Sequence, residues 1–87
     1  MVKRVIMIEI SEIIRETLAE NESNAYYWDA MNDNGYYIHI NNNGTFVCFK
    51  STKKTMEIIT AEEFEYAANY TCYLNSISEE NFYSTFK

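Results

Sequence analysis

Tyr36-Tyr37-Ile38-His39-Ile40-Asn41-Asn42-Asn43-Gly44-Thr45-Phe46-Val47-Cys48-Phe49 is the stretch of sequence that decides the fold. Aromatic and β-branched residues, which favour strands, lie on both sides of an Asn-Gly step, and this arrangement is a strong signal for a β-hairpin. A second Asn-Gly step, Asn34-Gly35, follows another aromatic segment at residues 25–30. The sequence therefore predicts a three-stranded antiparallel meander.

The second hairpin has a definite predicted register. A two-residue turn at Asn43-Gly44 pairs Ile40 with Val47 and Ile38 with Phe49, so that four apolar side chains share one face of the sheet.

Two registers are possible for the first hairpin. A two-residue Asn34-Gly35 turn would bury the Asp29 carboxylate without an evident partner, which is costly. A three-residue loop over residues 33–35 with a glycine bulge avoids this burial, and we prefer it. The bulged loop places three residues on the face that holds Ile38 and Ile40, namely Tyr26, Trp28 and Ala30.

Helices are predicted on both sides of the meander. Apolar residues recur at helical spacing over residues 10–21, with Ser11 as a candidate N-cap. A Thr60/Glu63 capping box begins a second helix over residues 61–74, and Ser78 begins a short last helix. Residues 56–59 fit either an edge strand or a helical lead-in, and residues 1–8 fit a strand, a helical extension or a loose segment.

We therefore expect one α+β domain spanning residues 1–87. The expected order is a helix, an antiparallel meander of three strands, or of four if residues 56–59 form a strand, and two helices packed on one face of the sheet. A chain of 87 residues has room for a single modest core, which leaves no space for a second domain.

The charge of the chain limits its partners. The formal net charge of −6 repels phosphate backbones, so direct binding of nucleic acid is not expected. Cys48 and Cys72 are too few for a disulfide framework and suggest buried thiols in a reducing compartment. The apolar run at residues 5–8 is too short for a membrane span or a signal peptide, so a cytoplasmic location is expected.

Catalytic and metal-binding patterns are scarce. The predicted register sets Asp29 across from His39, with Cys48 on its other side, but nothing marks an oxyanion hole, and we expect no enzyme activity. No zinc spacing is present. The Asp and Asn residues at 29–34 resemble half of a calcium loop, but the twelve-residue pattern with its terminal glutamate is absent and a hairpin turn explains these residues completely. The two glycines fit turns, so no phosphate-binding loop, cofactor or metal is expected.

The sequence leaves two interpretations of the eight tyrosines open. They could form an aromatic recognition surface, because tyrosine offers large contact area at low entropic cost. Alternatively, one tyrosine of each adjacent pair belongs to the core and the other covers the second face of the sheet.

Three segments carry a resemblance to a known family. Ile10-Ser11-Glu12-Ile13-Ile14-Arg15-Glu16, Ile40-Asn41-Asn42-Asn43-Gly44 and Glu79-Glu80-Asn81-Phe82-Tyr83 resemble, in order, segments of a small acidic phage anti-CRISPR protein. That family inhibits the type II RNA-guided nuclease and has a helix, three strands and two helices.

The resemblance implies an acidic DNA mimic. Such a protein binds the guide-loaded nuclease, as a monomer, where the protospacer-adjacent duplex would dock, and blocks recognition of target DNA. Asn42, Gly44 and Glu79 match family contact positions, whereas Asn43, Thr45 and Ser78 stand where the family has aspartate, asparagine and aspartate. The candidate partner-binding residues are Asn42, Asn43, Gly44, Thr45, Glu79, Glu80, Glu20 and Glu22.

The sequence also leaves a second functional hypothesis open beside the DNA mimic. A protein-interaction module without mimicry, such as an immunity or antitoxin protein or another phage inhibitor of a host enzyme, would use the tyrosine-rich sheet face instead of the carboxylates.

Overall fold

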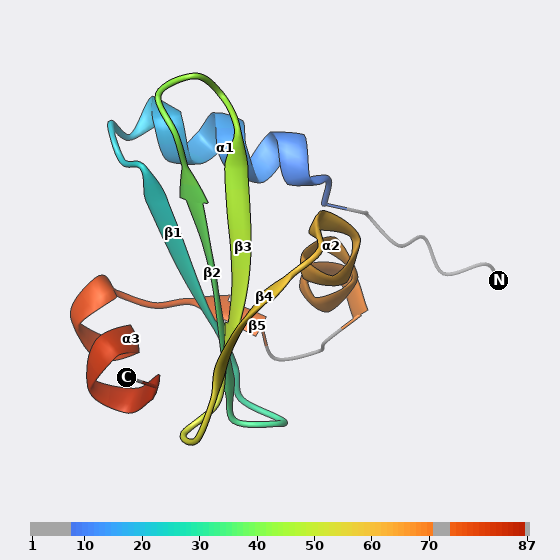
Figure 1. Cartoon of the computed structure of the whole chain (residues 1–87), viewed down its shortest axis with the longest axis vertical. Helices are drawn as coiled ribbons and strands as arrows, with labels where there is room; N and C mark the ends of the chain where they lie inside the picture. The colour runs from blue at the N-terminus through green and yellow to red at the C-terminus, as the bar shows by residue number, and fades with distance from the viewer. Residues whose placement is uncertain (1–7, 71–73, 87) are drawn as a thin grey trace, which may run out of the picture.

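The computed structural model describes residues 8–70 and 74–86. Its elements are α1 (Ile10–Ala19), β1 (Asn24–Asp29), β2 (Asn34–Ile40), β3 (Phe46–Ser51), β4 (Met56–Ile59), α2 (Ala61–Tyr70), β5 (Leu74–Ser76) and α3 (Glu79–Phe86). The strands form one antiparallel sheet in the order β4-β3-β2-β1-β5 (Figure 1). The α+β class and the order of helix, antiparallel meander and two helices are confirmed.

Helices cover both faces of this sheet. One core joins Ile38 of β2 to Ile13 of α1 and Phe64 of α2, and a second, smaller core joins Tyr26 of β1 to Phe82 and Phe86 of α3. Figure 1 accordingly shows α2 and α3 on opposite sides of the sheet. The expectation that both final helices pack on one face is therefore wrong for α3.

The pairs of adjacent tyrosines explain why helices pack on both faces of the sheet. Successive residues of a strand point to opposite faces, so Tyr27 and Tyr36 join the core under α1 and α2, while Tyr26 and Tyr37 face α3. A sheet that is aromatic on both sides is stabilised only when each side is packed.

The register predicted for β2 and β3 is wrong by one residue. Ile40 pairs with Phe46 and Ile38 pairs with Cys48. The hairpin closes with a three-residue loop, in which Asn41 N donates to Thr45 O at 2.7 Å and Gly44 N donates to Asn41 O at 3.0 Å. Only Gly44 of this loop has a positive φ, 89°, as in a type I turn followed by a glycine bulge. The extra loop residue moves Cys48 into the core and turns Val47 and Phe49 to the other face.

The preferred register of β1 and β2 is also wrong. Asp29 pairs with Asn34 across a four-residue loop at residues 30–33, and Asp33 has a φ of 55°. Ala25, Tyr27 and Asp29 therefore share the face of Ile38, opposite to the predicted set of Tyr26, Trp28 and Ala30. Gly35 lies inside β2 and not in the turn.

The buried Asp29 carboxylate explains this outcome. Its Oδ1 accepts hydrogen bonds from the main-chain N of Met31 (3.0 Å) and of Asn32 (3.2 Å), and its Oδ2 accepts one from Asn32 Nδ2 at 2.9 Å. The loop that Asp29 begins thus supplies the partners whose absence argued against burying it.

The helix starts agree in part with the predictions. Glu63 N donates to Thr60 Oγ1 at 3.0 Å and Asn81 N donates to Ser78 Oγ at 3.1 Å, so the Thr60 and Ser78 hydroxyls both cap their helices, as the sequence predicts. Ser11 is not the N-cap of α1, since Glu9 occupies that position without a side-chain cap.

Two short strands complete the sheet. Met56–Ile59 is a strand, which settles the alternative left open by the sequence. Leu74–Ser76 pairs with β1 where the sequence predicts the end of the second helix, and the described part of that helix is Ala61–Tyr70. The loose or extended segment expected over residues 1–8 falls, apart from Ile8, outside the described residues, as does Cys72.

Candidate functional site

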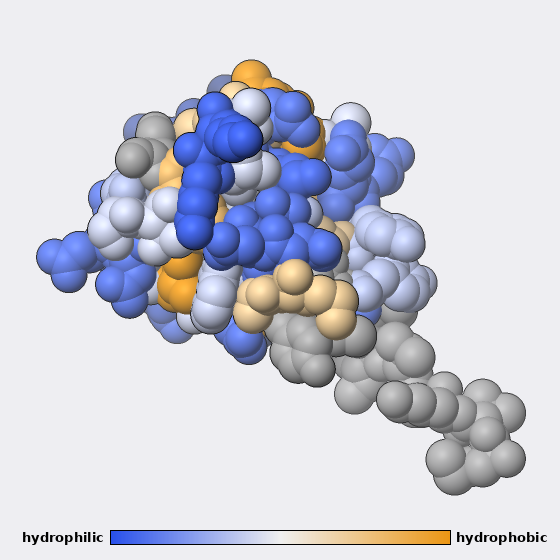
Figure 2. All heavy atoms as spheres, turned by 90° about the horizontal axis from the view of Figure 1, so that it is seen from below, coloured by the Kyte–Doolittle hydropathy of each residue, from blue (hydrophilic) through white to orange (hydrophobic). Residues whose placement is uncertain are grey.

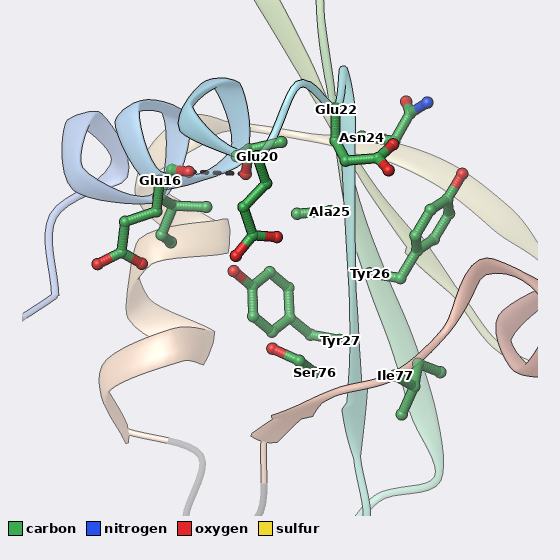
Figure 3. Close-up of a pocket in the computed structure, with 11 residues that line it drawn as sticks. Glu16, Glu20, Glu22, Asn24, Ala25, Tyr26, Tyr27, Ser76 and Ile77 are labelled. Carbon is green, nitrogen blue, oxygen red and sulfur yellow. Dashed lines mark hydrogen bonds between the residues drawn. The ribbon is translucent and has the colours of Figure 1, made fainter.

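A pocket of about 230 Å³ opens where the carboxyl end of α1 passes over the start of β1. Residues 24–27 of β1 line one side, and Ser76 with Ile77 line another. Three carboxylates belong to its lining, those of Glu16, Glu20 and Glu22 (Figure 3).

The end of α1 sets the position of these carboxylates. Asn21 adopts a left-handed conformation with a φ of 60°, which asparagine tolerates better than most residues. Asn21 N donates to Leu18 O at 3.0 Å and Glu22 N donates to Thr17 O at 3.2 Å, the bonding that ends many helices. This fixed turn brings Glu20 and Glu22, on either side of Asn21, to the same pocket.

The negative potential inside the pocket affects the pKa of Tyr27. Burial raises the pKa of its phenol, and the carboxylates of Glu16 and Glu20 raise it further. Figure 3 shows the Glu20 carboxylate pointing toward the Tyr27 hydroxyl. Among the described residues that line the pocket there is no lysine or arginine, so no cationic side chain in the lining offsets these carboxylates.

The same carboxylates oppose the stability of α1. Glu16 and Glu20 are four residues apart and repel one another along the helix surface. Glu20 also stands at the C-cap, where the negative end of the helix dipole disfavours an anion, and the last turn has no basic residue. A bound cationic group would relieve both repulsions.

The tip of the β2–β3 hairpin carries four of the predicted residues: Asn42, Asn43, Gly44 and Thr45. All four are exposed. Asn43 Oδ1 accepts hydrogen bonds from Thr45 N at 3.1 Å and Thr45 Oγ1 at 2.7 Å. The tip is therefore an internally bonded polar loop, with Asn42 beside these contacts.

The tip and the turn after α1 lie at the same end of the molecule (Figure 1). Ile40 N, at the base of the hairpin, donates to Ser23 O at 2.8 Å, and Ser23 follows Glu22. The structure thus brings the hairpin base next to the Glu20–Glu22 turn.

Glu79 and Glu80 occupy the first turn of α3, where the helix dipole favours carboxylates. The pKa of Tyr26 is raised chiefly by burial and by a hydrogen bond with Tyr83, and Glu79 adds to the shift. Neither Glu79 nor Glu80 belongs to the pocket lining, although Tyr26 does, and both are exposed on the first turn of α3.

Most of the residues that line the pocket were not among the predicted site residues, and Glu16 and Tyr27 matter most among them. Glu16 could have been found from its spacing of four residues to Glu20, which places both on one side of a helix. Tyr27 could not, because its face depends on the strand register that the sequence left ambiguous.

The trio of His39, Asp29 and Cys48 is not assembled. His39 pairs with Asn24 and Val47, on the opposite face from Cys48 and Asp29, and its Nδ1 lies 2.8 Å from Asn24 Oδ1. Burial raises the pKa of the Cys48 thiol to about 11, which disfavours a nucleophilic thiolate. Within residues 8–70 and 74–86, no three His, Cys, Asp or Glu side chains are grouped as metal ligands.

The opposite end of the molecule has a different electrostatic character. Lys53 Nζ lies 3.1 Å from Asp33 Oδ2, and this ion pair joins the β3–β4 loop to the β1–β2 loop. Viewed from this end, the surface is mainly hydrophilic (Figure 2). A shallower cavity of about 600 Å³ beside α2 includes Lys50 next to Glu62 and Glu63, so its charges are mixed.

None of the helices in the described segments is long and apolar enough to cross a membrane. Comparison of the chain with protein-family models, with curated proteins and with solved structures finds no match in any of the three.

Proposed function

We propose that this chain is a non-catalytic inhibitor that presents carboxylates to the basic nucleic-acid groove of a host enzyme. The single observation that carries the proposal is the pocket whose lining includes Glu16, Glu20 and Glu22 and, among the described residues, no lysine or arginine. Its most specific form is an anti-CRISPR protein that binds the guide-loaded type II nuclease at the protospacer-adjacent-motif site, in the cytoplasm of the host bacterium.

Binding alone accounts for inhibition in this proposal. Arginines that read a DNA duplex are already placed for anions, and carboxylates can pair with them in two-pronged geometry. The exposed amides at the hairpin tip supply further polar groups at the same end of the molecule. The tip itself has no carboxylate, so the acids of α1 and the following turn provide most of the charge.

The test is a binding and cleavage assay with several purified type II nucleases, each with and without guide RNA. We expect stoichiometric inhibition that competes with target DNA and weakens as salt rises, because exposed charges are screened. If the protein binds none of the nucleases tested, the anti-CRISPR form of the proposal is wrong.

Charge-reversal variants locate the surface. The double change Glu20→Lys and Glu22→Lys should weaken inhibition more than tenfold, which corresponds to about 1.4 kcal/mol. The matched control, Glu57→Lys with Glu62→Lys, alters net charge equally at exposed acids outside the pocket and should inhibit nearly normally. Combining Asn42→Lys with Glu79→Lys tests the tip and α3 in the same assay. Equal losses in the pocket and control pairs would assign inhibition to net charge alone.

A second candidate function rests on an exposed aromatic pair. Tyr66 and Tyr70 on α2 are 66% and 55% exposed, with ring centroids 4.7 Å apart. Such a pair suits a protein-interaction module of the immunity or antitoxin kind. Tyr66→Ala would then abolish partner binding while the Glu20 and Glu22 changes would not.

A further inference from the structure

β1 is longer than the strand that covers its outer edge. β5 pairs with residues 27–29 of β1, and Ile77 N then donates to Tyr26 O at 3.0 Å before the chain turns into α3. Asn24, at the start of β1, lies beyond this cover.

The main-chain groups of Asn24 point to that open edge. Ile40 N donates to Ser23 O, so Ser23 faces β2, and in an antiparallel pair successive residues alternate in direction. The outward bond at Tyr26 O fits the same alternation, which turns Asn24 N–H and C=O away from β2. Within the described residues, no main-chain hydrogen bond reaches Asn24 from the outer side.

The acidic pocket lies on this open edge. Asn24, Tyr26 and Tyr27 are part of its lining, together with the carboxylates of α1 and the turn that follows it. An unpaired strand edge is a template for an extended segment of another chain, which gains affinity from main-chain bonds and specificity from side-chain pockets.

Charge complementarity defines the segment that fits. Among the described residues the lining offers carboxylates, an outward carbonyl and no cationic side chain. A guanidinium carries five donors and no acceptor, so it complements this lining. A second copy of this chain is a poor occupant, because each copy has a net charge of −6.

We propose that the partner adds an extended segment to the free edge of β1 at Asn24 and places an arginine side chain in the pocket beside Glu20. This inference rests on the proposed function for the identity of the partner, but the docking surface can be measured on the isolated protein.

The first experiment follows main-chain amide NMR signals while two blocked pentapeptides are added, each of alternating Thr and Val with Arg or Gln at the centre. The Arg peptide should bind about tenfold more tightly than the Gln peptide and shift the signals of Asn24, Tyr27 and Glu20. Glu20→Gln should remove most of this preference, whereas Glu57→Gln should keep it. Equal binding of the two peptides, or no shifts in this region at about 5 mM Arg peptide, would overturn the inference.

A matched pair of variants tests the strand edge itself. Asn24→Pro removes the outward N–H without removing a bond to β2, which is tolerated at an edge position, and Asn24→Ala keeps the N–H. Both variants lose the contact of the Asn24 side chain with His39, so that loss cancels in the comparison. Asn24→Pro should lower affinity for the Arg peptide at least about fivefold relative to Asn24→Ala. Circular dichroism checks that both variants fold. If Asn24→Pro does not fold, the loss of preference for the Arg peptide in Glu20→Gln decides whether the inference stands.

The nuclease assay separates the two proposals. Peptide binding without inhibition of any nuclease would leave the docking surface standing and remove the proposed target. Inhibition that is equal for Asn24→Pro and Asn24→Ala would keep the target and refute the docking surface.

Discussion

Asp29 is 1% exposed, yet its carboxylate accepts two main-chain bonds and one side-chain bond from the loop that follows it. An ionisable group persists in such a position only when its hydrogen-bonding capacity is used. This residue holds the β1–β2 loop closed and thereby fixes which face of β1 meets α1.

Asp29→Ala should lower the free energy of unfolding by about 2–3 kcal/mol, because the main-chain amides of Met31 and Asn32 lose their shared carboxylate acceptor and the loop loses its closing bonds. Urea denaturation monitored by circular dichroism measures the change. Asp33→Asn is the control, since Asp33 is exposed and asparagine tolerates its positive φ, and its midpoint should hardly move. An unchanged midpoint for Asp29→Ala would mean that the loop closes without the carboxylate.

At the scale of elements, α3 is held against the sheet through a glycine. A Cβ atom on Gly35 would come within 2.6 Å of Phe82 Cε2 and 2.7 Å of Phe86 Cδ2. The rings of α3 thus rest directly on the main chain of β2, beside Tyr37 and Tyr26.

Gly35→Ala should destabilise the fold by about 1–3 kcal/mol, because these buried rings must shift to admit a methyl group. Hydrogen exchange should show the largest loss of protection in α3. Gly44→Ala is an informative contrast: nothing lies within 4 Å of its added Cβ, and only its positive φ strains the variant. Full protection of α3 in Gly35→Ala would show that α3 does not depend on this contact.

The carboxylate of Glu20 adds negative charge to the pocket but lowers the stability of α1. Glu20→Lys should raise the melting temperature by about 2 °C, because it replaces repulsion from Glu16 and from the helix dipole with attraction. Under the proposed function the same variant inhibits less well. Calorimetry of wild type, Glu20→Gln and Glu20→Lys should give a rising series, and a fall in that series would contradict the electrostatic account.

These elements also show where sequence reasoning succeeds. The caps at Thr60 and Ser78 were predictable because a cap is a local bond between residues three apart. The hairpin registers were not. The Asn43-Gly44 step closes a three-residue loop, the Asn34-Gly35 step lies inside β2 beyond a four-residue loop, and a one-residue difference in register reverses every side chain. Glu20 and Glu22, two of the predicted partner-binding residues, line the same pocket; the helical spacing to Glu20 also indicates Glu16, whereas Tyr27 joins the lining only through the strand register.

At the scale of the whole molecule, acidic side-chain groups buried in both cores link stability to pH. Burial raises the pKa of Cys48 from 9.0 to about 11 and raises the pKa values of Tyr26, Tyr27, Tyr36 and Tyr37 above 10.0. The folded state therefore holds these protons more tightly than the unfolded state.

The stability they contribute is complete below about pH 9 and is lost as the pH rises toward 11 and beyond. Thermal melts should show a plateau up to about pH 9 and a steep fall above it. Tyr36→Phe should reduce the slope of that fall, whereas Tyr66→Phe, at an exposed position, should leave it as in the wild type. A flat profile to pH 11 would rule out this linkage.

The sequence by itself determined the α+β class, the meander, two helix caps and the acidic end of α1, because each depends on neighbours along the chain. Only the tertiary structure decided the strand registers, the burial of Asp29 and the side of the sheet that α3 covers. It also decided the start of α1, where Glu65 of α2 accepts a hydrogen bond from Ile10 N at 2.9 Å. These features depend on contacts between residues far apart in sequence, and the better packing of two aromatic faces selects among alternatives that local propensity leaves nearly equal.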